Sequence, residues 1–384
     1  MQPGMASTHA STRRTARAAR RARAALAAST LVVAAACGAA AADAPASDAP
    51  LLAAGDSVVL ADSGRLALGD LANAGLHVAD DVVWVGDRQN GRVVRFARDG
   101  RALGVVGRAG GGPGELRAPG PLAPLAGGAV AVWDYGGSKV VAYEADGAVR
   151  SETPVREQAL PLQLQPVGDT LWLGVVSLGG RTGAMRLALP GGAPERLAPM
   201  PAEYVEGLAY SAPYSLALRL GDTLLVGYAA HHRVFLHHAG GVDSLILPSR
   251  LRRGVPPDLL AQIKAGLERR EPAKAVESYV STLSRAARLP DGSVALVHYD
   301  VEFDHTTGAP ADADAWLTVL APDFRRACVD APLPLAERSL PSLAFRGDTL
   351  FVLEQPITGD RTVPVLRPLA ISTAGCAWLP VERG

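Results

Sequence analysis

The chain has 384 residues, and its 38 Lys and Arg side chains balance its 38 Asp and Glu side chains, so the formal net charge is zero. A balanced charge provides no global field to attract nucleic acid or an acidic membrane surface, so we expect no nucleic-acid partner. The length alone fits two or three ordinary domains or one large all-β domain.

Residues 1–42 have the order of a secretory signal segment. Arginines crowd the first 25 residues, an apolar run follows from Ala24 to Ala36, and small residues follow Cys37. This order predicts export and cleavage. The apolar run is shorter than the roughly 20 residues that a transmembrane helix needs.

The end of this run, Ala34-Ala35-Ala36-Cys37, resembles the lipobox of bacterial lipoproteins, although Ala34 stands where leucine is usual. The resemblance implies lipidation at Cys37, so that the chain would contact the membrane only through an N-terminal lipid anchor. Cleavage without lipid near residues 40–42 and an unstructured Ala-rich leader are the alternatives. Residues 43–50, rich in Ala, Pro and Asp, are expected to form a flexible tether.

An internal repeat marks the body of the chain. Residues 82–100 (VVWVGDRQNGRVVRFARDG) align without a gap with residues 129–147 (AVAVWDYGGSKVVAYEADG), so that Asp87 matches Asp134. Each unit has a β-branched strand, a turn, a second strand and an Asp-Gly tight turn, followed in the first unit by a more polar third strand.

The start of this unit returns at residues 168–173, 221–226, 291–296 and 347–352, which gives six units in all. Six such units predict an all-β fold over residues 51–384, a six-bladed β-propeller of four-stranded antiparallel blades. The widest gap, between the fourth and fifth units, has Pro256-Pro257-Asp258 followed by apolar residues at helical spacing. It predicts an inserted helix near 256–270 that lies over one face.

Two further features concern the ring and its linkers. Residues 56–63 are a candidate closing strand that would pair with the last blade. The glycine run from Gly107 to Gly114 could be mistaken for a phosphate loop, but such loops need a helix after them, whereas Pro113 and Pro119 interrupt the segment here and the next element is a strand. We therefore expect a structural turn.

The segment from Gly107 to Leu116, placed after the first repeat, resembles the inter-blade signature of NHL-repeat and related bacterial six-bladed propellers. The signature is close in the first blade, partial in the second and reduced to strand patterns in the others. The resemblance supports the fold and implies a ligand-binding or scaffolding role. Lyases and lactonases are among the more distant relatives.

Acidic residues gather in the fifth unit. Asp300, Glu302 and Asp304 alternate, so an extended chain would point them to one side, with His305, Asp312 and Asp314 nearby. Such hard oxygen ligands suit calcium, although the spacing is not that of an EF-hand loop. A calcium or other metal site and a plain solvated loop both stay open.

His77 is expected on the innermost strand of the first blade, where it would be either a channel residue near a ligand or an ordinary packing residue. The pairs His231-His232 and His237-His238 lie at opposite ends of one strand, too far apart to form a single site. The recurrence of Asp87 and Asp134 at equivalent positions indicates that they brace turns rather than carry out chemistry.

Two cysteines, Cys328 and Cys376, lie in the body of the chain. Export would allow them to pair, but the repeat places them on outer strands of neighbouring blades that fan apart, and a disulfide needs Cα atoms within about 7 Å. We therefore expect free thiols.

Nothing in the sequence marks a nucleophile. We expect an exported or envelope-anchored binding or scaffolding propeller that recognises a peptide, glycan or protein. The alternative is a metal-dependent lactonase- or lyase-like propeller enzyme with its site at the central channel. Calcium is the candidate cofactor.

Overall fold

The computed structural model describes residues 49–384, apart from 62–63, 73, 156–158, 178–180, 210–212, 232, 270–279, 304–309, 336–339 and 359–360. Cys37, the predicted signal segment and most of the predicted tether lie outside the described residues, as do His232, Asp304 and His305. Within the described part, no helix has the length and apolar character needed to cross a bilayer.

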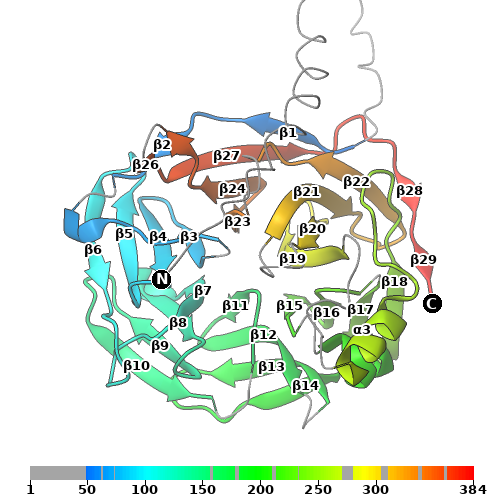
Figure 1. Ribbon diagram of the computed structural model, residues 1–384, viewed down its shortest axis with the longest axis horizontal. Coiled ribbons are helices and arrows are strands. Elements are labelled where there is room, and N and C mark those ends of the chain that lie inside the picture. Colours follow the sequence, from blue (N-terminus) through cyan, green and yellow to red (C-terminus); the bar gives the residue numbers. More distant parts are fainter. Residues whose placement is uncertain are drawn as a thin grey trace, which may run out of the picture. The chain divides into compact units, whose positions relative to one another are not determined.

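The described chain forms six antiparallel sheets arranged as blades in a ring (Figure 1), so the predicted six-bladed β-propeller is confirmed. The first strand of each blade lies innermost, and neighbouring inner strands contact one another around the whole ring.

The blades follow one another in chain order. Blade 1 has β3 (Leu76–Val78), β4 (Val82–Asp87), β5 (Arg92–Ala97) and β6 (Ala102–Val106). Blade 2 has β7 (Pro119–Pro124), β8 (Val130–Asp134), β9 (Lys139–Tyr143) and β10 (Val149–Pro154). Blade 3 has β11 (Leu164–Val167), β12 (Thr170–Ser177), β13 (Thr182–Ala188) and β14 (Glu195–Pro199).

The later blades take in strands from both ends of the chain. Blade 4 has β15 (Ser215–Leu220), β16 (Thr223–Tyr228), β17 (Arg233–His238), β18 (Gly241–Ile246) and β29 (Glu382–Arg383). Blade 5 has β19 (Val280–Arg288), β20 (Val294–Phe303), β21 (Pro310–Leu320), β22 (Arg326–Pro332) and β28 (Leu379–Pro380). Blade 6 has β23 (Ser342–Arg346), β24 (Thr349–Glu354), β27 (Val365–Ser372) and β1 (Leu51–Ala54), with β2 (Val58–Val59) also on β27.

Short elements complete the fold. They are α3 (Leu259–Glu268), a π-helical turn (Tyr204–Leu208), two 3-10 turns (Gly64–Leu66 and Ala126–Gly128) and the small hairpin of β25 (Ile357–Thr358) and β26 (Arg361–Thr362).

The core lies between the blades. Strands such as β4 are buried on both faces, because each blade packs its two sides against its two neighbours. Between blades 1 and 6, for example, Val83, Val85 and Phe96 pack with Phe351 and Leu353. Successive side chains of a strand point to opposite faces, and both faces of each blade are buried, so aliphatic side chains supply most of the packing.

The repeated aspartates brace turns, as predicted. Asp87 is fully buried, and its carboxylate accepts hydrogen bonds from Gly69 N, from Asn90 N and Nδ2, and from Arg92 Nε at 2.8 Å. Asp134 accepts from the backbone N–H groups of Arg117 and Ala118. Each carboxylate thus ties the linker before its blade to the end of the second strand.

The inserted helix is confirmed as α3, which begins after Asp258 and buries Leu259 and Ile263. The glycine run lies in the linker between β6 and β7, where Glu115 accepts a hydrogen bond from Gly112 N at 2.8 Å. It is a structural turn, as expected.

Ring closure involves more chain than predicted. Within the predicted segment 56–63, β2 does pair with β27, but the full outer strand of blade 6 is β1, farther upstream. Three of the four residues of β1 are exposed, so its sequence shows none of the alternation that marks a half-buried strand.

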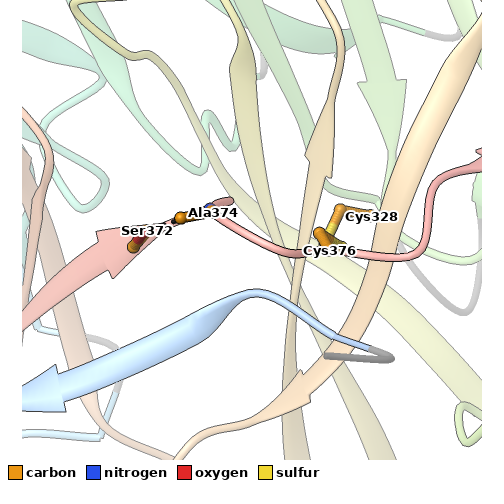
Figure 2. Close-up of a disulfide and its surroundings, with 4 residues drawn as sticks. All are labelled: Cys328, Ser372, Ala374 and Cys376. Atoms are coloured by element: carbon orange, nitrogen blue, oxygen red, sulfur yellow. Dashed lines mark hydrogen bonds between the residues drawn. A yellow bond between two sulfur atoms is a disulfide. The ribbon is translucent and has the colours of Figure 1, made fainter. Parts of the chain in front are cut away.

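The prediction of free cysteine thiols is wrong. Cys328 on β22 is bonded to Cys376, with Cα atoms 6.1 Å apart, as Figure 2 shows. After β27 ends at Ser372, a turn in which Ala374 N donates to Ser372 Oγ sends the chain out of blade 6. The chain then runs back along the outer rim, where β28 pairs with β22 and β29 pairs with β18. We call residues 373–384 the C-terminal strap.

Candidate functional site at the mouth of the central channel

One face of the ring carries both the linkers between blades and the loops between second and third strands, and we call it the linker face. The two kinds of loop are bonded together: Tyr135 N, just after β8, donates to Ala118 O in the linker before β7. The insertion with α3 belongs to the linker between blades 4 and 5. The longest loops and the helix are therefore parts of the connections that make up this face.

Arg285 is a buried cation on the inner strand β19. It is 8% exposed, its Nε donates to Leu343 O at 3.4 Å and one Nη donates to Ser284 O at 2.9 Å. A guanidinium has five N–H donors, and the remaining three have no acceptor among the described residues. No carboxylate of the described residues lies within 4 Å of it. Its charge is therefore left without a counter-ion by this part of the chain.

Two tyrosines from opposite blades lie near enough to interact electrostatically with this charge. Tyr135 of blade 2 donates its hydroxyl to Pro161 O at 2.6 Å, and Tyr299 of blade 5 donates its hydroxyl to Pro341 O at 3.2 Å. Both acceptors precede the inner strand of a following blade, so both hydroxyls are fixed at the linker face.

The tyrosines do not neutralise Arg285. Burial raises the pKa of Tyr135 and of Tyr299 above the ordinary value, and the Arg285 charge only partly opposes this rise. Both phenols therefore stay protonated at neutral pH. Burial also lowers the pKa of Arg285, which is the expected response of a cation that lacks an ionised partner. A second guanidinium, that of Arg88, stacks 5.5 Å from the centre of the Tyr135 ring.

A glutamine links three consecutive blades next to Arg285. The Gln163 carboxamide donates to Ala217 O on β15 at 3.3 Å and accepts from Ala286 N on β19 at 2.9 Å. This side chain therefore ties the inner strands of blades 4 and 5 to the linker before β11. These bonds fix the backbone beside Arg285.

His77 lies on the inner strand of blade 1, as predicted. Burial and then the nearby charge of Arg346 lower the pKa of His77 to about 4, so the ring is neutral at pH 7. Arg346 is itself paired with Asp80 in the turn between β3 and β4. The structure therefore places His77 near the ion pair of Arg346 and Asp80 and not with the acidic residues of blade 5.

The acidic residues of blade 5 form part of a long hairpin. Strand β20 continues to Phe303 and β21 begins at Pro310, with Asp300 opposite Asp314 and Glu302 opposite Asp312. The solvated-loop alternative is therefore wrong for residues 300 and 302, because Asp300 pairs with Ser281 and Asp314 in the strands on its two sides and Glu302 pairs with Asp312.

Asp300 is buried and already satisfied. It accepts hydrogen bonds from Arg253 N at 2.8 Å, from Trp316 Nε1 at 3.0 Å and from Ser281 Oγ. Glu302 is exposed. Among the described residues, no three His, Cys, Asp or Glu side chains come close enough together to hold a metal ion. The predicted partners Asp304 and His305 lie outside those residues.

Arg285 was not singled out from the sequence. The sequence did contain a signal, because Arg285 is a charged residue among small residues on a strand that the repeat places innermost. Inner strands of a propeller are shielded by neighbours on both sides, so an arginine there requires either a partner or a ligand. The bulge at Leu283 and Arg285 hid this position from a simple count of alternation.

No protein-family model matches the chain, and no curated protein matches it. Among solved structures, a DUF4221-family protein from Bacteroides vulgatus is similar at 10% identity, with a TM-score of 0.59, over 85% of this chain and 99% of that one. A protein from Bacteroides fragilis whose name gives it as exported is similar at 11% identity, with a TM-score of 0.57, over 85% and 98%. At these identities the likeness shows the fold alone.

Proposed function

We propose that this chain is an exported binding propeller that holds the carboxylate group of its ligand at the linker-face mouth of the central channel. The observation that carries the proposal is Arg285, a buried guanidinium with three unused N–H donors and no acidic partner among the described residues. No nitrogen of Arg285 is both fully buried and without a partner among the described residues, so its free N–H groups are open to solvent or to a ligand. A ligand carboxylate would accept two parallel N–H bonds from the guanidinium.

The surroundings suit such a ligand. Tyr135 is partly exposed and offers aromatic surface, and Arg88 adds a second positive charge next to its ring. Tyr299 is 3% exposed and packs in the core, so it supports the wall from behind. The hydroxyls of both tyrosines are already bonded to carbonyl groups, so selectivity would come from charge and shape. Peptides with a free C-terminus, acidic side chains and acidic sugars all carry the required group.

Export is part of the proposal and has separate support. The N-terminal residues have the order of a signal segment, and the body of the chain contains the bond between Cys328 and Cys376. Disulfides persist mainly in oxidising compartments outside the cytosol. Lipidation at Cys37 is tested by incorporation of radiolabelled palmitate. Incorporation that is unchanged in Cys37→Ala would rule this anchor out.

The binding proposal is tested by thermal unfolding of the purified protein in sodium acetate, succinate or citrate, with sodium chloride at equal ionic strength as reference. A specific carboxylate raises the melting temperature progressively with its concentration, and the stabilisation reaches about 2.7 kcal/mol at a hundredfold excess over Kd. Arg285→Met should abolish the rise. Arg285→Lys should weaken it, because lysine keeps the charge and loses the fork.

A matched control is Arg186→Met, which removes an exposed arginine paired with Glu195 in blade 3. It should keep the full response to carboxylate. Without ligand, Arg285→Met should be at least as stable as the wild type, since an apolar side chain replaces an unpaired buried charge. A strong loss of stability in Arg285→Met, together with no carboxylate response in the wild type, would make Arg285 a structural residue and overturn the proposal.

A further inference from the structure

A pocket lies between blades 4 and 5. This cavity has a volume of about 90 Å³ and is lined by residues of β17, β19 and β20 and by the segment 247–255 that leads to α3. Val234, Leu247, Val255 and Leu283 supply apolar wall. A cavity of this size holds several waters or a molecule of a few heavy atoms.

Two imidazoles line the cavity, those of His231 and His298, and the Nδ1 atom of His231 accepts from Arg233 N. His298 is 5% exposed, and its Nδ1 lies 3.5 Å from Nη1 of Arg252. A guanidinium can only donate, so Nδ1 is the acceptor and the proton is on Nε2. This Nε2 is buried and has no hydrogen-bond partner among the described residues. Burial and then Arg252 lower the pKa of His298 well below its usual value, so the ring stays a neutral donor.

The tautomer of His298 is fixed by a chain of contacts. Arg252 Nε donates to Asp330 Oδ1 at 2.6 Å, and Arg252 Nη2 donates to Pro248 O at 2.7 Å. The other oxygen of Asp330 accepts from the backbone N–H groups of residues 250, 251 and 252. The segment that roofs the cavity and the imidazole in its wall are thus held by one buried carboxylate.

The charge balance selects the kind of ligand. Arg252 is neutralised by Asp330, and Ser281 already accepts from Gly254 N and donates to Asp300. Ser249 and Arg233 also line the wall, where Ser249 donates to Asp330 and Arg233 donates to Ser244 Oγ. Asp300 and Asp330 place two buried negative charges behind the wall, opposite the two arginines. His298 Nε2 therefore calls for a hydrogen-bond acceptor on a small, mostly apolar body.

We propose that the cavity between blades 4 and 5 binds a small neutral carbonyl compound, whose oxygen accepts a hydrogen bond from Nε2 of His298. The site is separate from the channel mouth in place and in chemistry. It does not depend on the carboxylate site, so Arg285→Met should leave it intact.

The test uses the full chain labelled with 15N-histidine, titrated with N-methylacetamide or acetone, with acetate as the charged counterpart. We expect a saturable shift of the His298 Nε2 resonance with both neutral probes and none with acetate. His298→Gln keeps a donor and should bind roughly tenfold more weakly, as detected by saturable changes in the probe's own relaxation. His298→Phe removes the donor and should abolish binding.

Since His298→Phe could unfold the chain, Val255→Phe provides a second variant, which fills the cavity from the roof and leaves the imidazole in place. It should also abolish the shift of His298 Nε2. A wild-type resonance that never saturates with either neutral probe would mean that the cavity holds water only. Equal binding in Val255→Phe would show that the probes bind elsewhere. Either result overturns the proposal.

Discussion

The bond between Cys328 and Cys376 should contribute strongly to stability. The two cysteines are 48 residues apart in the sequence, and the loop-entropy relation gives about 4 kcal/mol at 25 °C for a loop of that length. We expect native packing to be preserved when the bond is cut, because Cys328 is buried in β22 and the strap also pairs with β22 and β18. The loss should therefore come mainly from the larger freedom of the unfolded chain.

The measurement is urea unfolding with and without reductant, with free thiols counted in each sample. The midpoint should fall in reductant and in Cys376→Ser, and reductant should have no further effect on the double variant Cys328→Ala/Cys376→Ser. An unchanged wild-type midpoint in a sample whose two thiols are both free would refute this reasoning. Peptide mapping without reduction verifies the bond itself.

Three more predictions concern buried ionisable groups. Asp87→Ala should lower the free energy of unfolding by about 3–5 kcal/mol in urea titrations, because Arg92 loses its buried partner; a loss as small as that of an exposed Asp146→Ala would contradict it. Burial raises the pKa of Asp330, but Arg252 and the backbone N–H groups of residues 250 and 251 outweigh this effect and keep the pKa below its usual value of 3.8. The ionised Asp330 therefore stabilises the folded state above pH 3.8, and this stabilisation is lost on further acidification. Asp330→Asn should remove that acid-sensitive part and speed tryptic cleavage after Arg250, and unchanged cleavage would argue against the anchoring role. Folding lowers the pKa of His77 from 6.5 to about 4, so the unfolded state binds more protons than the folded state between these pH values. The free energy of unfolding should therefore fall by up to about 3 kcal/mol as the pH drops from 6.5 to 4. His77→Gln should reduce this fall, and an unchanged dependence of the unfolding free energy on pH would contradict the prediction.

The sequence predicted the ring, the blade order and α3, because these depend on local patterns. The gapless match between residues 82–100 and 129–147 fixes strands, turns and the bracing aspartates together. Each blade buries both of its faces in the same way, so the same pattern of apolar strands and turns recurs in each unit of the sequence and identifies each blade. Helical spacing after Pro256-Pro257 was equally local.

The features that the sequence could not show depend on contacts between distant segments. The path of the strap back over blade 5 brings Cys376 to Cys328, and no repeat encodes that path because residues 373–384 lie beyond the last unit. Asp300 looked like a solvated acid, yet its three donors come from three separate segments. The importance of Arg285 likewise rests on the lack of an acidic neighbour among the described residues, which a linear pattern does not report.

The strap also affects how the molecule meets other copies of itself. Strands β18 and β22 would otherwise present rows of unpaired N–H and C=O groups at the rim, next to exposed apolar side chains such as Val242. Open edges of this kind are templates for edge-to-edge aggregation. The strap pairs with Leu245 and Ile246 in blade 4 and with Arg326 and Ala327 in blade 5, so it closes part of each open edge and should reduce edge-to-edge association.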